Sequence, residues 1–296
     1  MQQRRLRRLE TLALSSRQLP ISFSVVGVQK AATSTLYKML TRHREVAGGH
    51  EKEIRFFMEE ARDWDDPDYS TYCRPAEHPA VRVAGDATPA YIFWPRALER
   101  MHRYNPGMRL IATFRDPVER AFSEWSMQRT RDAGFPDLPE AVRRFSARHV
   151  PNEISRESPP YEVRRQALVT RGLYGQQLER GLRHFPREQW LLIGFRDFLT
   201  HHTSTLDRVT DHIGVHRYRR YPGLQHRGAT ASGHAGRPPS ADDVRHLVEL
   251  YADDLALFAR LSGLDVSRWP TTRVLSGDLD VAEFSDLLSR KLGLGS

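Results

Sequence analysis

The chain has 296 residues, with 45 Lys and Arg against 37 Asp and Glu, so its formal net charge is +8. Its length allows one large α/β domain or two small ones, and its positive charge favours an anionic partner. A single cysteine, Cys73, excludes a disulfide framework and a cysteine-based metal site, and no zinc-finger spacing or Lys/Arg-rich repeat points to nucleic acid. Arginine dominates the basic residues, which suits phosphate or sulfate contacts but also fits the codon bias of a GC-rich genome.

Residues 1–18 are basic with a few apolar side chains and lack the continuous apolar segment of a signal peptide. No apolar run approaches the roughly 18 residues that a membrane span needs. We therefore expect a tail or short helix over 1–18, one domain over 19–296, no membrane span and a cytoplasmic location.

Residues 21–40, ISFSVVGVQKAATSTLYKML, predict a buried strand, a tight turn and a helix that starts with hydroxyl side chains. Backbone N–H groups at such a helix start attract phosphate, and Lys30 adds a full charge. The common phosphate-loop pattern G-x-x-x-x-G-K-[ST] is absent, because Lys30 follows Gly27 by three residues and no Ser or Thr comes next. The alternative is an ordinary turn with an exposed lysine.

Further elements follow in chain order. We expect a short strand at Val46, a loop with a short helix over 59–80, a strand over 81–85 and a helix over 95–104. A buried strand over 109–114 leads into Arg115-Asp116-Pro117, where Asp116 is a good N-cap and Pro117 a good first helical residue. The proline-containing stretch 130–170 is interpreted as an insertion over the site. The remaining pattern predicts a helix over 174–185, a strand over 189–195, helices over 199–213 and 241–261, and a loop over 221–239.

Strands that alternate with helices predict an α/β fold of P-loop-like type, with a central, mostly parallel sheet flanked by helices on both faces. In such sheets ligands bind at the carboxyl ends of the strands. Lys30 and Arg115 each lie just beyond a predicted strand end, so we expect them to converge on one anion.

Three stretches together resemble one family. GVQKAATSTL resembles the 5′-phosphosulfate loop of sulfotransferases that use 3′-phosphoadenosine-5′-phosphosulfate (PAPS), and RDPVERAFSEW resembles their 3′-phosphate motif. EKEIRFF and GDATPAY resemble the K-E-x-x-F-F and E-K-[ST]-P-x-Y segments of the heparan sulfate sulfotransferase branch, as in a bacterial-type member. The resemblance runs from about Phe23 to Leu264 and implies the same α/β fold.

The resemblance implies roles for individual residues. Lys30 would contact the 5′-phosphosulfate together with the rest of its loop, which comprises Ala31, Ala32, Thr33, Ser34 and Thr35. Arg115 and Ser123 would hold the 3′-phosphate, and Arg227-Gly228 would lie over the nucleotide, with Arg237 as a competing candidate. Glu53 would be the catalytic base, with His50 as a second candidate because some sulfotransferases use a histidine.

The sequence also departs from the family. The second lysine of the family, in E-K-[ST]-P, is replaced in this chain by Ala87, so one positive charge near the sulfuryl group is lost. Lys52 or an arginine can stand in, or the acceptor differs. Trp94 is a candidate for lining the acceptor site, and a metal site at His212 and His216 is disfavoured because no third ligand is fixed by the spacing.

These patterns predict transfer of a sulfuryl group from PAPS to an acceptor hydroxyl of a small molecule, glycan or lipid, without an obligatory metal. The alternatives are a nucleotide phosphotransferase, which would want Gly-Lys-Ser/Thr and a magnesium-binding carboxylate, and a non-catalytic anion-binding module. Each site residue also has a purely structural reading: Glu53 as a surface charge, Arg115 as an ion-pair partner of Asp116 or Glu119, and Ser123 as a helix-face hydroxyl.

Overall fold

A computed structural model describes the chain except for residues 1–16, 49–51, 148, 150, 225–238 and 292–296. The described residues form two compact units. Unit 1 comprises residues up to 27, 32–113 and 184–225, and unit 2 comprises 28–31, 114–183 and 226 onward. The single domain expected over 19–296 stays a prediction. Among the described residues, no helix is long and apolar enough to cross a membrane.

Unit 1 is built on a sheet with the strand order β2-β4-β1-β5-β6. Its strands are β1 (Gln18–Gly27), β2 (Val46–Ala47), β4 (Val83–Ala87), β5 (Arg109–Phe114, whose last residue belongs to unit 2) and β6 (Trp190–Gly194). The β2–β4, β4–β1 and β1–β5 pairs are parallel, whereas β3 (Cys73–Pro75) pairs antiparallel with the start of β1.

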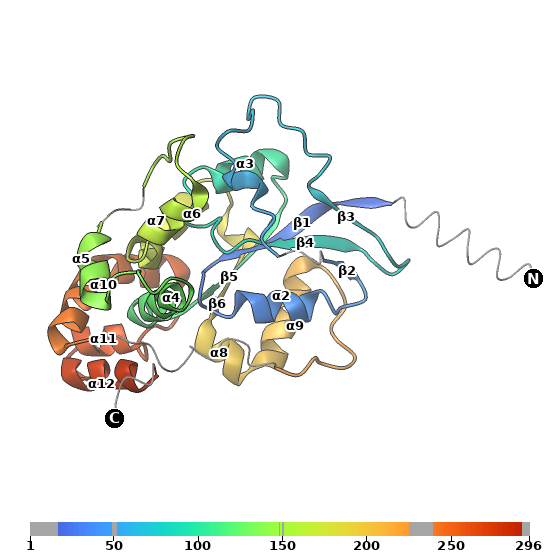
Figure 1. Cartoon of the computed structure of the whole chain (residues 1–296). Helices are drawn as coiled ribbons and strands as arrows, with labels where there is room; N and C mark the ends of the chain where they lie inside the picture. Colours follow the sequence, from blue (N-terminus) through green and yellow to red (C-terminus); the bar gives the residue numbers. More distant parts are fainter. Residues whose placement is uncertain (1–16, 49–51, 148, 150, 225–238, 292–296) are drawn as a thin grey trace, which may run out of the picture. The chain divides into compact units, whose positions relative to one another are not determined.

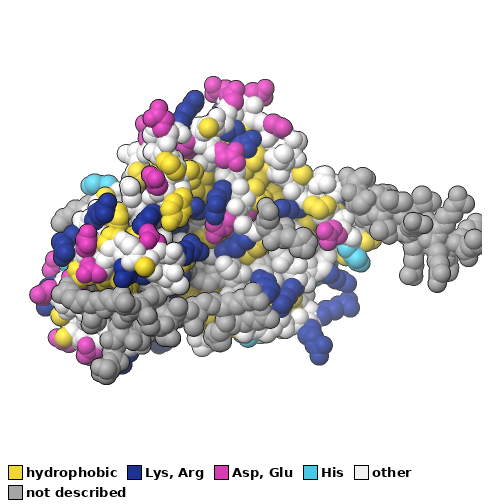
Figure 2. All heavy atoms as spheres, in the orientation of Figure 1, with side chains coloured by type: hydrophobic (Ala, Val, Ile, Leu, Met, Phe, Trp, Pro, Cys, Tyr) yellow, Lys and Arg dark blue, Asp and Glu magenta, His cyan; other side chains and the backbone are white. Residues whose placement is uncertain are grey.

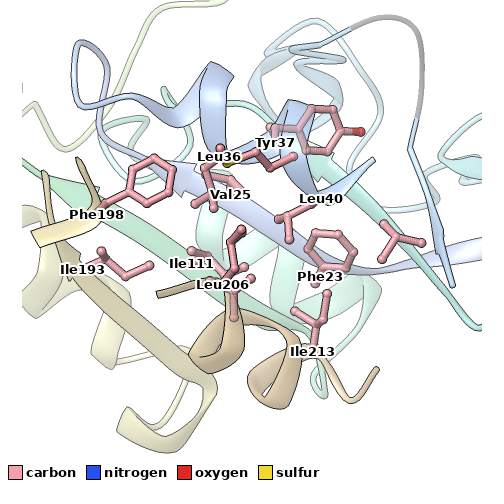
Figure 3. Packing of buried hydrophobic residues seen from close by; sticks show 14 of the residues in the cluster. Phe23, Val25, Leu36, Tyr37, Leu40, Ile111, Ile193, Phe198, Leu206 and Ile213 are labelled. Carbon is pink, nitrogen blue, oxygen red and sulfur yellow. The ribbon is translucent and has the colours of Figure 1, made fainter. Parts of the chain in front are cut away.

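Helices cover both faces of this sheet. α2 (Thr33–Leu40), α8 (Phe195–Thr200) and α9 (His202–Ile213) share one buried cluster with the strands, in which Phe23, Val25 and Ile111 meet helix side chains such as Leu36 and Leu206 (Figure 3). α3 (Ala97–Tyr104), beside the 3₁₀ turn η1 (Phe56–Met58), lies on the side opposite α2 and α9 (Figure 1). This arrangement confirms the predicted fold class.

Close packing in unit 1 depends on one glycine. A Cβ atom on Gly85 of β4 would lie 2.1 Å from Cζ of Phe23, whose ring is 1% exposed in the centre of the cluster. Because β1 and β4 are neighbours and Phe23 pairs in register with Gly85, only a residue without a side chain leaves room for the ring.

Unit 2 is helical. Its helices are α4 (Pro117–Arg131), α5 (Leu138–Arg144), α6 (Pro160–Gln166), α7 (Tyr174–Leu182), α10 (Ala241–Ser262), α11 (Pro270–Leu275) and α12 (Val281–Lys291), with a 3₁₀ turn η2 (Thr170–Gly172). Asp116 caps α4 as predicted, because its Oδ1 accepts a hydrogen bond from Glu119 N at 2.9 Å. Asp254 of α10 fixes the start of α7 by accepting from the backbone N–H groups of Gly175 and Gln176.

Two expectations about elements are wrong. The helix expected over 199–213 is two helices, because His201 has φ −124° and ψ 47°, which breaks the helical backbone between α8 and α9. The stretch 59–80, expected to be a loop with a short helix, contains the strand β3. In addition Gln18, assigned to the N-terminal tail, begins β1. A third 3₁₀ turn, η3 (Arg187–Gln189), precedes β6.

Candidate functional site

The loop between β1 and α2 adopts a backbone that side chains normally disfavour. Lys30 and Ala32 have φ angles of 72° and 60°, in the left-handed region where glycine is usual. Ala32 is the N-cap of α2 and gives that helix no side-chain cap, so the first N–H groups of α2 are left for another acceptor. Such strain is typical of functional loops, where the surrounding structure must hold it in place.

Lys52 extends onto the hydroxyl groups at the start of α2. Its Nζ donates to Ser34 Oγ at 2.6 Å and to Thr33 Oγ1 at 3.3 Å. Burial lowers the pKa of the Lys52 ammonium, although the carboxylates of Glu53 and Asp86 oppose this shift. Lys52 is therefore a second lysine that contacts the residues after Lys30. The sequence had suggested Lys52 as one possible replacement for the family lysine that is missing at Ala87.

Glu53 lies in a second strained loop of unit 1. Its φ is 67° and that of Arg55 is 59°, and with Lys30 and Ala32 these are all the non-glycine residues with positive φ in the described part of the chain. Two hydrogen bonds to the end of β4 hold this backbone: Glu53 N donates to Ala87 O at 3.0 Å, and Arg55 N donates to Thr88 Oγ1 at 3.4 Å.

The Glu53 carboxylate faces two cations. Arg55 Nη2 donates to Oε2 at 2.9 Å, and Lys52 Nζ lies 4.0 Å from Oε1. The side chain is 31% exposed, so solvent or a substrate can reach it. These pairs with Lys52 and Arg55 also fit the alternative reading of Glu53 as a surface charge in an acidic-basic run, so its role as the base stays a prediction.

The aromatic pair after Glu53 anchors the loop. Phe56 and Phe57 are 2% and 0% exposed. Phe57 packs against the rings of Trp64, Tyr72 and Tyr91, with ring centroids between 4.8 and 6.0 Å apart. Because this cluster is buried, the position of the preceding Glu53 is tied to the core of unit 1.

Asp86 supports the same loop through its hydrogen bond with Thr88, a role that sequence reasoning missed. The side chain is fully buried, and its Oδ2 accepts from Thr88 Oγ1 at 3.1 Å and from Tyr72 OH at 3.3 Å. Burial raises the pKa of the Asp86 carboxyl. Because the Thr88 hydroxyl donates to Asp86, its lone pairs face Arg55 N. The GDATPAY motif marked this segment but not its hydrogen bonds.

In unit 2, Arg115 contacts the backbone of Lys30, and the expected convergence of the two residues on one anion stays a prediction. Arg115 Nη1 donates to Lys30 O at 3.5 Å, and Tyr174 OH donates to Arg115 O at 3.0 Å. Arg115 Nε also donates to Glu119 Oε2 at 3.3 Å, so the ion pair of the structural reading is present. Burial lowers the pKa of Lys30, Glu124 opposes the shift, and Arg115 adds to it. Ser123 lies on α4 and is 8% exposed.

His50, Arg227, Gly228 and Arg237 fall outside the described residues. The acceptor-site reading of Trp94 is wrong, because its side chain is 0% exposed and its Nε1 donates to Glu60.

The histidine pair is not a metal site in the described structure. His212 contacts Leu110 O, and His216 bonds to Glu45. No cluster of three or more potential metal ligands occurs among the residues that the structure covers. Basic and acidic side chains both occur over the face shown in Figure 2, so the net charge alone does not locate the site.

Comparisons with known proteins agree with the motifs. No family model matches the chain. Human heparan sulfate glucosamine 3-O-sulfotransferase 6 is 27% identical over 196 residues, which cover 65% of this chain and 52% of that protein. Mouse heparan sulfate glucosamine 3-O-sulfotransferase 3A1 is 29% identical over 221 residues, covering 70% and 50%. The chain thus spans about half the length of the curated relatives it matches.

A solved structure shows the same fold. The sulfotransferase from Alicyclobacillus acidocaldarius superposes with a TM-score of 0.64 at 22% sequence identity, over 84% of this chain and 98% of that one. This likeness supports the fold, and the sequence relatives carry the same family name. The chain is therefore similar in sequence to heparan sulfate glucosamine 3-O-sulfotransferases and in fold to the sulfotransferase from Alicyclobacillus acidocaldarius, as its motifs predict.

Proposed function

We propose that this protein transfers the sulfuryl group of PAPS to a hydroxyl group of a carbohydrate acceptor. The observation that carries the proposal is the arrangement in unit 1 of a cation, two hydroxyl groups and a carboxylate: Lys52 bonds to Thr33 and Ser34 and lies beside Glu53. Sulfuryl transfer needs donors for the oxygens on sulfur and a base for the acceptor.

The proposed step is an in-line displacement at sulfur. The acceptor oxygen forms a bond to sulfur while the bond from sulfur to the bridging phosphate oxygen breaks. The electron pair leaves with 3′-phosphoadenosine-5′-phosphate (PAP), and Glu53 takes the acceptor proton. Negative charge grows on the bridging oxygen, so a cation there stabilises the transition state more than the ground state, and Lys30 is our candidate.

The 3′-phosphate of the nucleotide fits Arg115 and Ser123. A guanidinium presents five N–H donors in a fixed planar geometry, which suits a dianionic phosphate, and a hydroxyl such as that of Ser123 can add a further donor. The phosphotransferase alternative instead asks for a carboxylate directly after a second strand, and β5 is followed by Arg115. The anion-binding alternative gives no role to the strained, ion-paired Glu53.

The carbohydrate acceptor is inferred from the names of the curated relatives, which are glucosamine 3-O-sulfotransferases. A small molecule or a lipid hydroxyl is the alternative acceptor. The cytoplasmic location and the absence of a metal requirement remain predictions, as do the roles of His50, Arg227 and Gly228.

Calorimetry with PAP, ADP and 5′-AMP in the absence of Mg²⁺ tests the proposal. We expect PAP to bind and the affinity to depend on its 3′-phosphate. A preference for ADP that requires Mg²⁺ would favour the phosphotransferase. A following assay would measure PAP release from PAPS with sulfated and unsulfated glucosamine oligosaccharides, phenols and lipid alcohols, to identify the acceptor class.

A further inference from the structure

We propose that Lys52 is a second catalytic cation, whose ammonium group contacts the sulfuryl oxygens of the donor. This inference rests on the proposed function and adds to it, because the sulfuryl-transfer step as written above assigns its cation to Lys30 alone. All contacts that support it lie within unit 1.

The ammonium group of Lys52 lies near both the start of α2 and the proposed base. Lys52 Nζ lies 2.6 Å from Ser34 Oγ, 3.3 Å from Thr33 Oγ1 and 4.0 Å from Glu53 Oε1. The same charge therefore touches the hydroxyl groups of the anion loop and the carboxylate proposed as base. In an in-line displacement, sulfur must lie between the donor loop and the attacking oxygen beside the base, which is the region that Lys52 adjoins.

The hydrogen bonds from Lys52 fix the direction in which the hydroxyl groups of Thr33 and Ser34 can donate. An ammonium group is only a donor, so Thr33 and Ser34 accept its hydrogen bonds. Each hydroxyl group then has its own proton available to donate to an anion. An ammonium group has three N–H donors, and two are used on these oxygens. Lys52 and its two partners thus form a set of donors that suits a sulfonate, which has three oxygens and no proton.

The cation at this position is a lysine and not an arginine, although arginine is much more common in the chain. The chain contains four lysines, Lys30, Lys38, Lys52 and Lys291, against an Arg plus Lys total of 45. Lysine is therefore rare among the basic residues, yet Lys30 lies in the loop and Lys52 bonds to Ser34 at the start of α2. A compact ammonium group concentrates charge at a point, which suits a small anion, whereas a planar guanidinium suits paired oxygens such as those of a phosphate.

The backbone next to Lys52 is held in place, so its ammonium group is preorganised. Lys52 directly precedes Glu53, whose backbone N–H bonds to Ala87 O at 3.0 Å. The side chain of Lys52 is 24% exposed, and the acidic groups near it are Glu53 and the buried Asp86. A cation fixed in this way need not reorganise when charge develops, which is the condition for strong electrostatic stabilisation.

The test compares Lys52→Ala with Lys52→Arg and with Lys38→Ala, which removes a lysine from the same helix that carries Thr33 and Ser34. Calorimetry gives the affinities for PAPS and for PAP, which lacks the sulfuryl group. Rates of PAP release from PAPS are measured with water and with the best acceptor.

We expect Lys52→Ala to weaken PAPS binding about tenfold while PAP binding changes less than about twofold, and to slow PAP release on the order of 100-fold. Lys52→Arg should recover part of the rate because it keeps the charge, and Lys38→Ala should behave like the wild type. Equal losses for PAPS and PAP would show that Lys52 only orders the loop, and a normal rate for Lys52→Ala would also overturn the inference. Failure of the proposed function would look different, because the wild-type protein itself would then not bind PAP.

Discussion

Glu53, the proposed base, has a backbone conformation that a residue with a side chain normally disfavours. Positive φ at Glu53 and Arg55 turns the carboxylate towards Lys52 and keeps Arg55 on its Oε2 atom. The two hydrogen bonds to the end of β4 and the buried Phe56-Phe57 pair compensate for this strain. In the proposed mechanism an acceptor hydroxyl group would share the carboxylate with these cations, so substrate binding and base function would be coupled at one side chain.

Glu53→Gln tests the base. The amide keeps the shape and one acceptor for Arg55 but takes up no proton, so kcat should fall by about 100- to 10,000-fold with PAP affinity nearly unchanged. PAP release under saturating PAPS and PAP calorimetry measure the two quantities. Glu59→Gln, which removes an exposed carboxylate paired with Arg62, serves as the matched control. Normal turnover of Glu53→Gln would move the assignment to His50.

Arg115→Ala tests the recognition of the 3′-phosphate. Among the groups of the nucleotide, this guanidinium should contact only the 3′-phosphate. Its removal should therefore weaken PAP binding by about tenfold or more but hardly change the binding of adenosine-5′-phosphosulfate, which lacks that phosphate. Competition binding with both nucleotides gives the comparison. If both affinities fell equally, Arg115 would be a structural partner of Glu119 and of Lys30 O.

Among the strands and helices, the local sequence pattern predicted those whose ends are determined by local interactions. The strand 109–114 was predicted residue for residue, because its apolar run is closed by the Asp116 N-cap and Pro117. Apolar spacing continues from Phe198 to Leu206, so the pattern alone could not show that the backbone leaves the helical region at His201. Likewise β3 exists only through its pairing with residues 18–20, which lie far away in sequence.

The candidate site follows the same rule. Lys30, Arg115 and Glu53 each stand in a local motif, so the sequence could single them out. The Arg55 N–H bond to Thr88 joins segments 33 residues apart, and no periodicity encodes such a contact. The cation at Lys52 was in view as a possible substitute, but its bonds to Thr33 and Ser34 required the fold.

Gly85→Ala tests how tightly the strands next to the site are packed. Its Cβ atom would lie 2.1 Å from Phe23 Cζ and 2.5 Å from two other ring atoms, so β1 and β4 must separate or the ring must move. We expect a loss of about 1–3 kcal/mol or more in the free energy of unfolding, measured by denaturant titration. Gly223→Ala, where no atom lies within 4 Å of the added Cβ, is the control. Unchanged stability of Gly85→Ala would contradict this packing.

For the whole molecule, buried titratable groups make stability depend on pH in opposite directions. In unit 2, burial raises the pKa of Asp116 and of Asp254 to about 6 in each case. The folded state then binds protons more readily than the unfolded state, so these groups favour folding at low pH, and their contribution is lost as pH rises towards 6. In unit 1, burial lowers the pKa of His212 to about 4 and also lowers that of His43, so their effect has the opposite sign.

Asp254→Asn separates these effects. Asparagine loses one of the two acceptors that Asp254 offers to Gly175 N and Gln176 N, so the absolute stability can shift in either direction. The pH dependence is more informative than the absolute value: without a titrating carboxyl, unfolding free energy should fall less, or rise more, between pH 5 and pH 7 than in the wild type.

Denaturant titrations at both pH values, for wild type, Asp254→Asn and the neighbouring Asp253→Asn, give the measurement. Asp253 is exposed on the same helix and should leave the pH dependence unchanged. An identical pH dependence in all three proteins would mean that Asp254 is already ionised below pH 5. In that case the N–H groups at the start of α7 stabilise the carboxylate enough to offset its burial.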